Sequence, residues 1–140
     1  MTHMKKNILV VDDSALMRRV MCDIINSDSK FQATDYCRDG LEAYEKLKHT
    51  SYDGVVLDVN MPRMDGLQLL EKLQKEGIRA NVVMVSTLTD SREADVTILA
   101  MERGAIDFVA KPTNIIEAKG EAFKRQLLGC LLSTSPSPRD

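Results

Sequence analysis

Residues 7–14 read Asn-Ile-Leu-Val-Val-Asp-Asp-Ser, in which an unbroken apolar run at 8–11 is followed by two carboxylates and a serine. A short, continuous apolar run is typical of a strand that is covered on both faces of a parallel sheet. Ser14 is a good helix N-cap, and Leu16, Val20 and Ile24 follow it at four-residue spacing. The stretch therefore predicts a buried strand that ends in acidic residues and leads directly into a helix.

The same alternation of apolar run and helical period repeats five times, as far as Leu132. This order is typical of a parallel sheet with helices on both faces. The predicted strands are residues 7–11, 32–36, 54–57, 82–86 and 106–109. A last helix is expected where Ile116, Gly120, Phe123 and Leu127 continue the helical period. We predict an α/β fold, a doubly wound, flavodoxin-like parallel sheet of five strands in the order 2-1-3-4-5 with five helices.

Residues typical of turns and helix ends agree with this pattern. Asp39-Gly40 and Asp65-Gly66 are typical of turns, and Gly77 and Gly104 stand where helices are expected to end. The predicted elements therefore have plausible boundaries.

The length of 140 residues leaves room for one domain, which we place at residues 5–132. Residues 133–140, rich in serine and proline, are expected to be a flexible linker stub or a tail left by cloning, and the Met-Thr-His start resembles a cloning remnant. We do not expect an output module within this chain.

Charge and hydropathy exclude several functions. Nineteen Lys and Arg residues against 21 Asp and Glu residues give a formal charge of −2, which disfavours binding to nucleic acid through bulk charge. The longest apolar runs, of which residues 8–11 are one, are far too short to span a bilayer, and the N-terminus has no signal-peptide pattern. These features predict a cytoplasmic protein that does not insert into membranes.

Cysteine and histidine are scarce. Cys22, Cys37 and Cys130 are odd in number and show no Cys-x-x-Cys spacing, which favours a reducing compartment over a disulfide framework. With His3 and His49 as the only histidines, a zinc site or a hydrolytic triad is not expected.

Polar residues gather where the predicted strands end. Asp12 and Asp13 follow the first strand, and Asp58 follows the third. Ser86 and Thr87 stand at the end of the fourth strand, and Lys111-Pro112 after the fifth. Because the carboxyl ends of parallel strands border one crevice, the three carboxylates are expected to converge there.

Convergence of three carboxylates requires a cation. Two unit charges about 5 Å apart repel by roughly 3 kcal/mol at an effective dielectric near 20. Lys111 supplies one positive charge, and oxygen ligands that leave room for water suit Mg²⁺ better than zinc or a calcium cage. Taken singly, the same residues have plainer explanations: the aspartates as helix caps or turn residues, Lys111 as a solvated side chain and Ser86 as a hydroxyl bonded to its neighbours.

Four stretches together resemble the receiver domain of two-component response regulators, over Lys5 to Leu132. They are Ile-Leu-Val-Val-Asp-Asp-Ser at 8–14, Val-Leu-Asp-Val-Asn-Met-Pro-Arg-Met-Asp-Gly at 56–66, Val-Met-Val-Ser at 83–86, and Gly-Ala-Ile-Asp-Phe-Val-Ala-Lys-Pro at 104–112. Their sequences are most similar to the N-terminal receiver of the chemotaxis protein-glutamate methylesterase. The residues of its esterase domain have no counterpart here.

The resemblance implies a role for each residue at the strand ends. Asp58 would accept a phosphoryl group from a phosphohistidine of a partner histidine kinase. Asp13, Asp58 and the Asn60 backbone carbonyl would bind Mg²⁺, or Mn²⁺ in its place, with Asp12 acting mostly through water.

The resemblance extends to phosphoryl contacts and to switching. Ser86 and Lys111 would contact phosphoryl oxygens, Ser86 and Phe108 would act as the switch, and the Lys111–Pro112 peptide bond would be cis. Phe108 could equally be a fixed core residue. At Asn60 the chain departs from the methylesterase receivers, where an acidic residue is common, so the lifetime of the phosphoryl group is left open.

The implied output is a shift of the surface formed by the fourth helix, fifth strand and fifth helix, acting on an output domain or downstream protein, with the chain a monomer or weak dimer. No chemistry beyond its own phosphorylation and autodephosphorylation is expected. Two alternatives remain: a stand-alone or transcription-linked receiver that acts as a docking or dimerisation module, and a flavodoxin-like cofactor binder. Asp12-Asp13 argues against the latter, because it replaces a phosphate-cradling loop.

Overall fold

The computed structural model describes residues 5–86 and 93–133. The expectations for His3, for Thr87 and for residues 134–140 concern residues outside these ranges.

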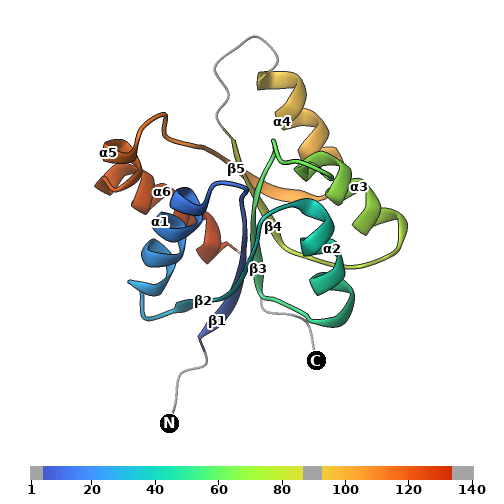
Figure 1. Ribbon diagram of the computed structural model, residues 1–140, viewed down its shortest axis with the longest axis horizontal. Helices are drawn as coiled ribbons and strands as arrows, with labels where there is room; N and C mark the ends of the chain where they lie inside the picture. The colour runs from blue at the N-terminus through green and yellow to red at the C-terminus, as the bar shows by residue number, and fades with distance from the viewer. Residues whose placement is uncertain (1–4, 87–92, 134–140) are drawn as a thin grey trace.

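Five parallel strands form one sheet in the order β2-β1-β3-β4-β5, so the predicted fold and strand order are confirmed (Figure 1). The strands are β1 Lys6–Val11, β2 Phe31–Cys37, β3 Gly54–Asp58, β4 Val82–Ser86 and β5 Ala105–Ala110. The helices are α1 Ala15–Asn26, α2 Gly40–His49, α3 Gly66–Lys75, α4 Glu93–Glu102, α5 Ile115–Ala118 and α6 Glu121–Leu132. None of the described helices has the length and apolar character needed to cross a bilayer.

The last predicted helix is two helices, so the described residues hold six helices and the expectation of five was wrong. Asn114 caps α5 by accepting a hydrogen bond from the Glu117 backbone N–H, and Gly120 becomes the N-cap of α6. A Cβ at Gly120 would lie 3.2 Å from the Glu117 carbonyl oxygen, so the absence of a side chain lets the chain turn sharply between the helices. The turn separates Ile116, which is 81% exposed, from the buried face of α6.

The Lys111–Pro112 peptide bond is trans, and no peptide bond among the described residues is cis. The prediction of a cis bond was therefore wrong. The trans form of an X–Pro bond is favoured by about 0.5–1 kcal/mol unless surrounding contacts select the cis form.

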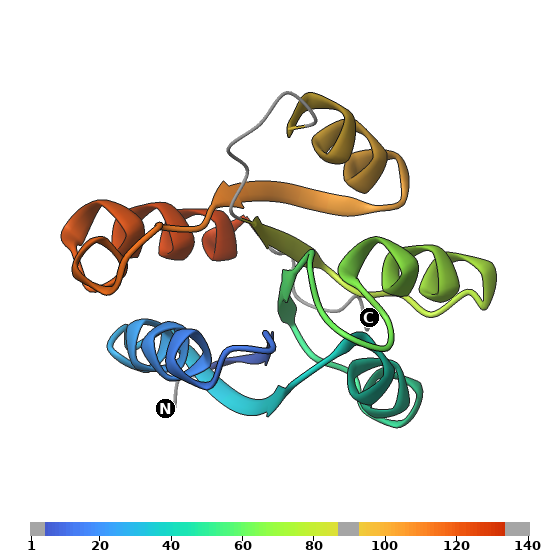
Figure 2. The ribbon, with the colours of Figure 1, turned by 45° about the horizontal axis from the view of Figure 1, so that its top comes forward.

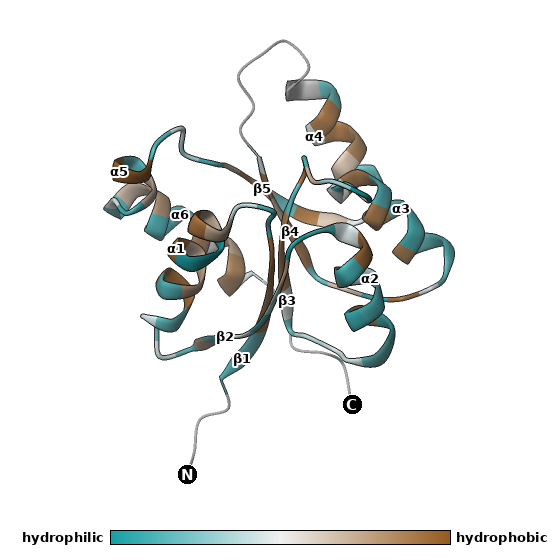
Figure 3. Ribbon diagram, viewed as in Figure 1, coloured by the Kyte–Doolittle hydropathy of each residue, from teal (hydrophilic) through white to brown (hydrophobic). Residues whose placement is uncertain are grey.

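The core consists of two layers, one on each face of the sheet. Figure 2 shows α1, α5 and α6 on one side of the strands and α2, α3 and α4 on the other. Figure 3 shows hydrophobic residues along the strands and hydrophilic residues on the outward sides of several helices. Adjacent residues of a strand serve different layers: Val10 packs with the α1 and α6 side, and Val11 packs with the α2 and α3 side.

Helix caps fix where the helices begin. Ser14 caps α1 as predicted, through a hydrogen bond from the Met17 backbone N–H. Asp39 and Asp65, expected in turns, are the N-caps of α2 and α3. Helices α2 and α3 therefore both begin in the loops at the carboxyl ends of the strands, where the acidic residues that follow β1 and β3 also lie.

Candidate functional site

Three carboxylates meet at the carboxyl ends of β1 and β3. These strands are neighbours, with Val11 of β1 paired in register with Leu57 of β3. The next residues, Asp12 and Asp58, therefore stand side by side, and Asp13 follows. One carboxylate oxygen from each of the three aspartates lies within 4.8 Å of those of the other two.

Burial differs sharply among the three aspartates. Asp12 is 0% exposed and Asp58 is 3% exposed, whereas Asp13 is exposed. The backbone of Asp12 is held by the Arg18 guanidinium, whose Nη1 donates to the Asp12 carbonyl oxygen at 2.8 Å. One side-chain oxygen of Asp12 accepts from the Ser14 backbone N–H at 2.8 Å. The start of α1 thus fixes the first of the buried carboxylates.

Lys111 supplies the positive charge at this cluster. Its backbone N–H donates to the Ser86 carbonyl oxygen at 2.9 Å. Hydrogen bonding between the β4 and β5 segments thus continues one residue beyond the end of β5. Its Nζ lies 2.9 Å from Asp12 Oδ2 and 3.2 Å from Asp58 Oδ2. The Asp12 contact is an ion pair without hydrogen-bond geometry, since Asp12 Oδ2 has no hydrogen-bond partner among the described residues.

The electrostatics of the cluster show in the pKa values of Asp58 and Lys111. Burial, followed by the charge of Asp12, raises the pKa of Asp58 to about 7, and the opposing pull of Lys111 does not cancel this. Burial also acts to lower the pKa of Lys111, but its contacts with Asp12 and Asp58 outweigh burial and raise it. The site therefore has more negative charge than its own lysine neutralises.

Ser86, at the end of β4, is completely buried, and its Oγ has no hydrogen-bond partner among the described residues. A buried hydroxyl without a partner is costly, so the group requires an explanation, of which a ligand is one. Phe108 of β5 is half-buried and packs against the α2 and α3 side of the core. Asn60 is exposed and is the second residue of the loop between β3 and α3.

The loop from Asn60 to Asp65 carries an ion pair that the sequence did not reveal. Arg63 Nη2 lies 2.7 Å from Asp39 Oδ2, and Asp39 is 4% exposed. The spacing of Asp39 and Glu42 is the sequence signature of a helix N-cap, so the capping role of Asp39 could have been predicted. The pairing with Arg63 has no such signature.

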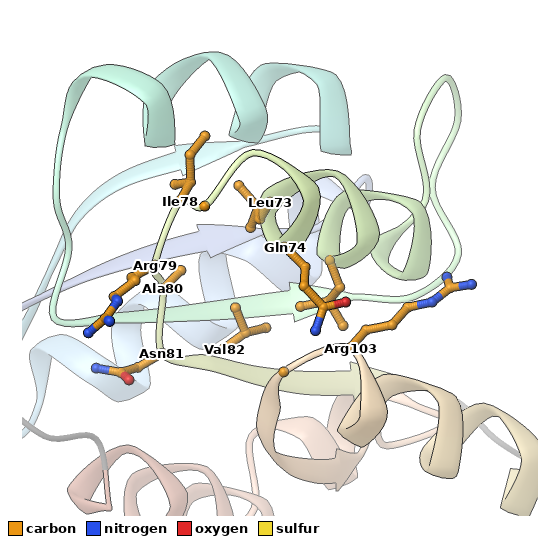
Figure 4. A pocket seen from close by; sticks show the side chains of 11 residues that line it. Leu73, Gln74, Ile78, Arg79, Ala80, Asn81, Val82 and Arg103 are labelled. Carbon is orange, nitrogen blue, oxygen red and sulfur yellow. The ribbon is translucent and has the colours of Figure 1, made fainter.

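A cavity of about 530 Å³ lies at the opposite edge of the sheet, near the amino ends of β4 and β5 (Figure 4). Leu73, Ile78 and Val82 line it, and Arg79 and Arg103 lie at its two ends. Arg103 donates to the Leu67 carbonyl oxygen at 3.0 Å, so one of these cations is already engaged. The polar groups of this cavity do not converge on one point, unlike those of the carboxylate cluster.

The carboxylate cluster fits a hard divalent cation. All of its side-chain donors are oxygens, which Mg²⁺ prefers, and the exposed Asp13 leaves one side open to solvent. Asp12 Oδ2, which pairs with Lys111, and Ser86 Oγ have no hydrogen-bond partner among the described residues, so both could still contact a ligand bound at the cluster. The arrangement can bind a divalent cation and present Asp58 to a phosphorus atom.

Comparison with known proteins gives one matching family description, the response regulator receiver domain, over residues 8–120. The protein-glutamate methylesterase/protein-glutamine glutaminase of Pyrococcus horikoshii is 43% identical over 135 residues, which cover 96% of this chain and 36% of the relative. The enzyme of the same name from Shigella boydii is 50% identical over 109 residues, which cover 77% of this chain and 34% of the relative. The chain thus spans about a third of the length of these relatives.

Solved structures agree. The response regulator domain of Thermotoga maritima CheB has 35% identity and a TM-score of 0.80, covering 94% of this chain and 96% of its own. A chain of the CheX–CheY–BeF3–Mg complex from Borrelia burgdorferi has 29% identity and a TM-score of 0.75. The match covers 91% of this chain and 87% of that one.

Proposed function

This chain belongs to the response regulator receiver domain family, and from that membership we propose that it is a phosphorylation switch whose phosphoacceptor is Asp58. The observation that carries the proposal is the cluster of Asp12, Asp13 and Asp58 with Lys111 reaching its two buried members. The donor is a phosphohistidine of a histidine kinase.

The proposed step is an in-line transfer to a carboxylate oxygen. An oxygen of ionised Asp58 attacks the phosphorus, a P–O bond forms, and the P–N bond to the donor imidazole breaks. The imidazole leaves with the electron pair of that bond and is protonated from solvent. Such transfers depend mainly on positioning and on neutralising the charge of the phosphoryl oxygens.

Asp13, Asp58 and the Asn60 carbonyl would hold Mg²⁺ directly, with Asp12 holding it mostly through water; Mn²⁺ could substitute. When bound, the ion supplies positive charge beside the phosphoryl oxygens. Support comes from the all-oxygen donor set and from the raised pKa of Asp58, which marks a site that favours added positive charge. The CheX–CheY complex that contains a similar chain was solved with BeF3 and Mg, a combination that Asp58 and its neighbours would accept here.

Lys111 and Ser86 would receive the phosphoryl group. The Lys111 ammonium already lies 3.2 Å from Asp58, so it would bond a phosphoryl oxygen attached there with little movement. Ser86 would donate its hydroxyl, which has no partner in the described part of the chain, to a second oxygen. The movement of Ser86 would draw the neighbouring backbone of β4 and let Phe108 turn inward.

The output surface would be formed by α4, β5 and the helical segment that follows β5, which here consists of α5 and α6. Ile98 and Met101 on α4 and Ile106 on β5 are large apolar residues that are exposed. A phosphorylated receiver would change the presentation of this surface to an output domain or downstream protein, by a shift between two existing conformations. We place the switch in a chemotaxis system in the cytoplasm, acting on a methylesterase domain like that of its relatives.

The proposal is tested by titrating the protein with beryllofluoride in the presence of Mg²⁺ and recording two-dimensional amide NMR spectra. Wild type should show saturable shifts at Asp58, Ser86, Lys111 and the α4–β5 surface. The Asp58→Asn variant should show none of the beryllofluoride shifts. The proposal is overturned if wild type does not respond, or if Asp58→Asn responds equally.

A further inference from the structure

The loop between β3 and α3 contains a strained turn. The Met64 backbone N–H donates to the Pro62 carbonyl oxygen at 2.7 Å, a hydrogen bond that spans only two residues. Arg63, between them, has φ +65°, and it is the one non-glycine residue with positive φ among the described residues. A γ-turn with a positive central φ is the rare and strained form, and a residue with a Cβ adopts it only when surrounding contacts impose it.

Asp39 supplies the contact that holds Arg63. Nε and Nη2 of Arg63 lie 2.8 Å and 2.7 Å from the same oxygen, Asp39 Oδ2. The other oxygen of Asp39, Oδ1, accepts from the Glu42 backbone N–H at 2.9 Å and caps α2. The two oxygens of one buried carboxylate thus have separate tasks: one fixes a helix and the other fixes the loop.

Two glycines close the same loop on its neighbours. The Gly40 backbone N–H donates to the Met64 carbonyl oxygen at 2.9 Å, and a Cβ at Gly40 would lie 2.4 Å from that oxygen. The Gly66 backbone N–H donates to the Val59 carbonyl oxygen at 2.8 Å, and a Cβ at Gly66 would lie 2.4 Å from the Asp58 carbonyl oxygen. The loop is therefore tied to the start of α2 and to the end of β3.

We propose that Asp39 and Arg63 are positioning residues that hold the β3–α3 loop in the conformation in which it contributes to cation binding at Asp58. The inference rests on the proposed function, because that function gives the Asn60 carbonyl of this loop a place among the metal ligands. A loop already fixed in the binding conformation loses little freedom when the cation binds. Groups that orient metal ligands from outside the ligand set typically change metal affinity by about 10- to 100-fold when removed.

Two substitutions separate positioning from stability. Asp39→Asn retains Oδ1, and asparagine caps helices as well as aspartate does, but its side-chain NH2 cannot accept a bond from Arg63. Arg63→Gly removes the guanidinium and at the same time relieves the positive φ, which glycine adopts freely. Arg79→Gly, which removes an exposed arginine from the loop between α3 and β4, is the matched control.

The experiment measures the dissociation constant of Mg²⁺ by NMR titration, together with amide hydrogen exchange in the metal-free protein. Asp39→Asn and Arg63→Gly should each weaken Mg²⁺ binding about 10-fold, and the double variant should be no weaker than either single one. Exchange of the Gly40 amide, which bonds the loop, should accelerate in both variants without metal. Arg79→Gly should match wild type in every measurement.

The outcomes distinguish the two proposals. If wild type binds Mg²⁺ and both variants bind it equally well, the positioning role is overturned while the proposed function stands. If the effects of the two substitutions on affinity add, the residues do not act as a pair and the inference is also overturned. If wild type itself does not bind Mg²⁺, both proposals fail.

Discussion

The Nζ atom of Lys111 lies 3.2 Å from the Oδ2 atom of Asp58, at the end of a strand that is not a neighbour of β3 in the sheet. The lysine therefore reaches across the end of β4 to the proposed phosphoacceptor. It also touches Asp12, so a single ammonium group serves two buried carboxylates. This deficit of positive charge leads to measurable consequences for the metal-free protein.

The stability of the metal-free protein should fall as pH rises from 5 to 7. Burial and the charge of Asp12 raise the pKa of Asp58 to about 7, whereas an unfolded aspartate has a pKa of about 3.9. Between these values the folded state holds a proton that the unfolded state has lost, so the free energy of unfolding decreases with pH, by about 1 kcal/mol per pH unit. Urea unfolding in a chelator measures this slope, and Asp58→Asn should remove it. An equal slope in that variant would contradict the assignment.

Lys111→Met should destabilise the metal-free protein by about 3 kcal/mol, because it leaves Asp12 and Asp58 buried without a cation. Saturating Mg²⁺ should restore most of the loss. Lys75→Met removes an exposed lysine paired with Glu71 and should change stability by no more than about 0.5 kcal/mol. Urea unfolding with and without Mg²⁺ compares the two variants. A loss at Lys111 that Mg²⁺ does not reduce would show that packing, rather than charge, is what the lysine provides.

Ser86→Ala should have opposite effects in the two states of the site. Without ligand, it removes a buried hydroxyl with no partner among the described residues, and should raise the free energy of unfolding by about 1 kcal/mol. With Mg²⁺ and beryllofluoride, it should weaken binding, since the proposed donor is lost. Unfolding and titration of the same sample measure both effects. Destabilisation of the ligand-free protein would mean that the hydroxyl has a partner there.

Two glycine substitutions should act in opposite directions. Gly66→Ala would place a Cβ 2.4 Å from the Asp58 carbonyl oxygen and should cost about 2 kcal/mol or more. At Gly129, inside α6, an added Cβ would have no atom within 4 Å. Gly129→Ala should therefore raise the free energy of unfolding by about 0.5–1 kcal/mol, because alanine favours the helix. Thermal unfolding of both variants tests the pair. Equal effects at the two positions would refute the close approach of Gly66 to β3.

Much of the fold follows from local sequence. The short apolar run Ile8 to Val11, followed by a helix cap, favours a buried strand, and the structure places β1 there. The meeting of Asp12 and Asp58 followed from topology, since neighbouring parallel strands bring their ends together. These features depend on residue type and chain order alone, which a sequence contains.

Other features depend on contacts between distant residues. The apolar period through Ile116 and Phe123 predicted one helix, yet Ile116 faces solvent because the chain turns at Gly120. Arg63, which has a positive φ, pairs with Asp39, 24 residues earlier in the chain. No local pattern specifies such a pairing, so the contact of the β3–α3 loop with Asp39 could be found only from the structure.

The division of the core into two layers gives neighbouring residues of one strand different surroundings. Val109 packs with the α1 and α6 layer, while its neighbour Phe108 packs with the layer beneath α3 and α4. An inward turn of Phe108, as proposed for the switch, would therefore disturb packing beneath α3 and α4 before it reached the opposite face of the sheet.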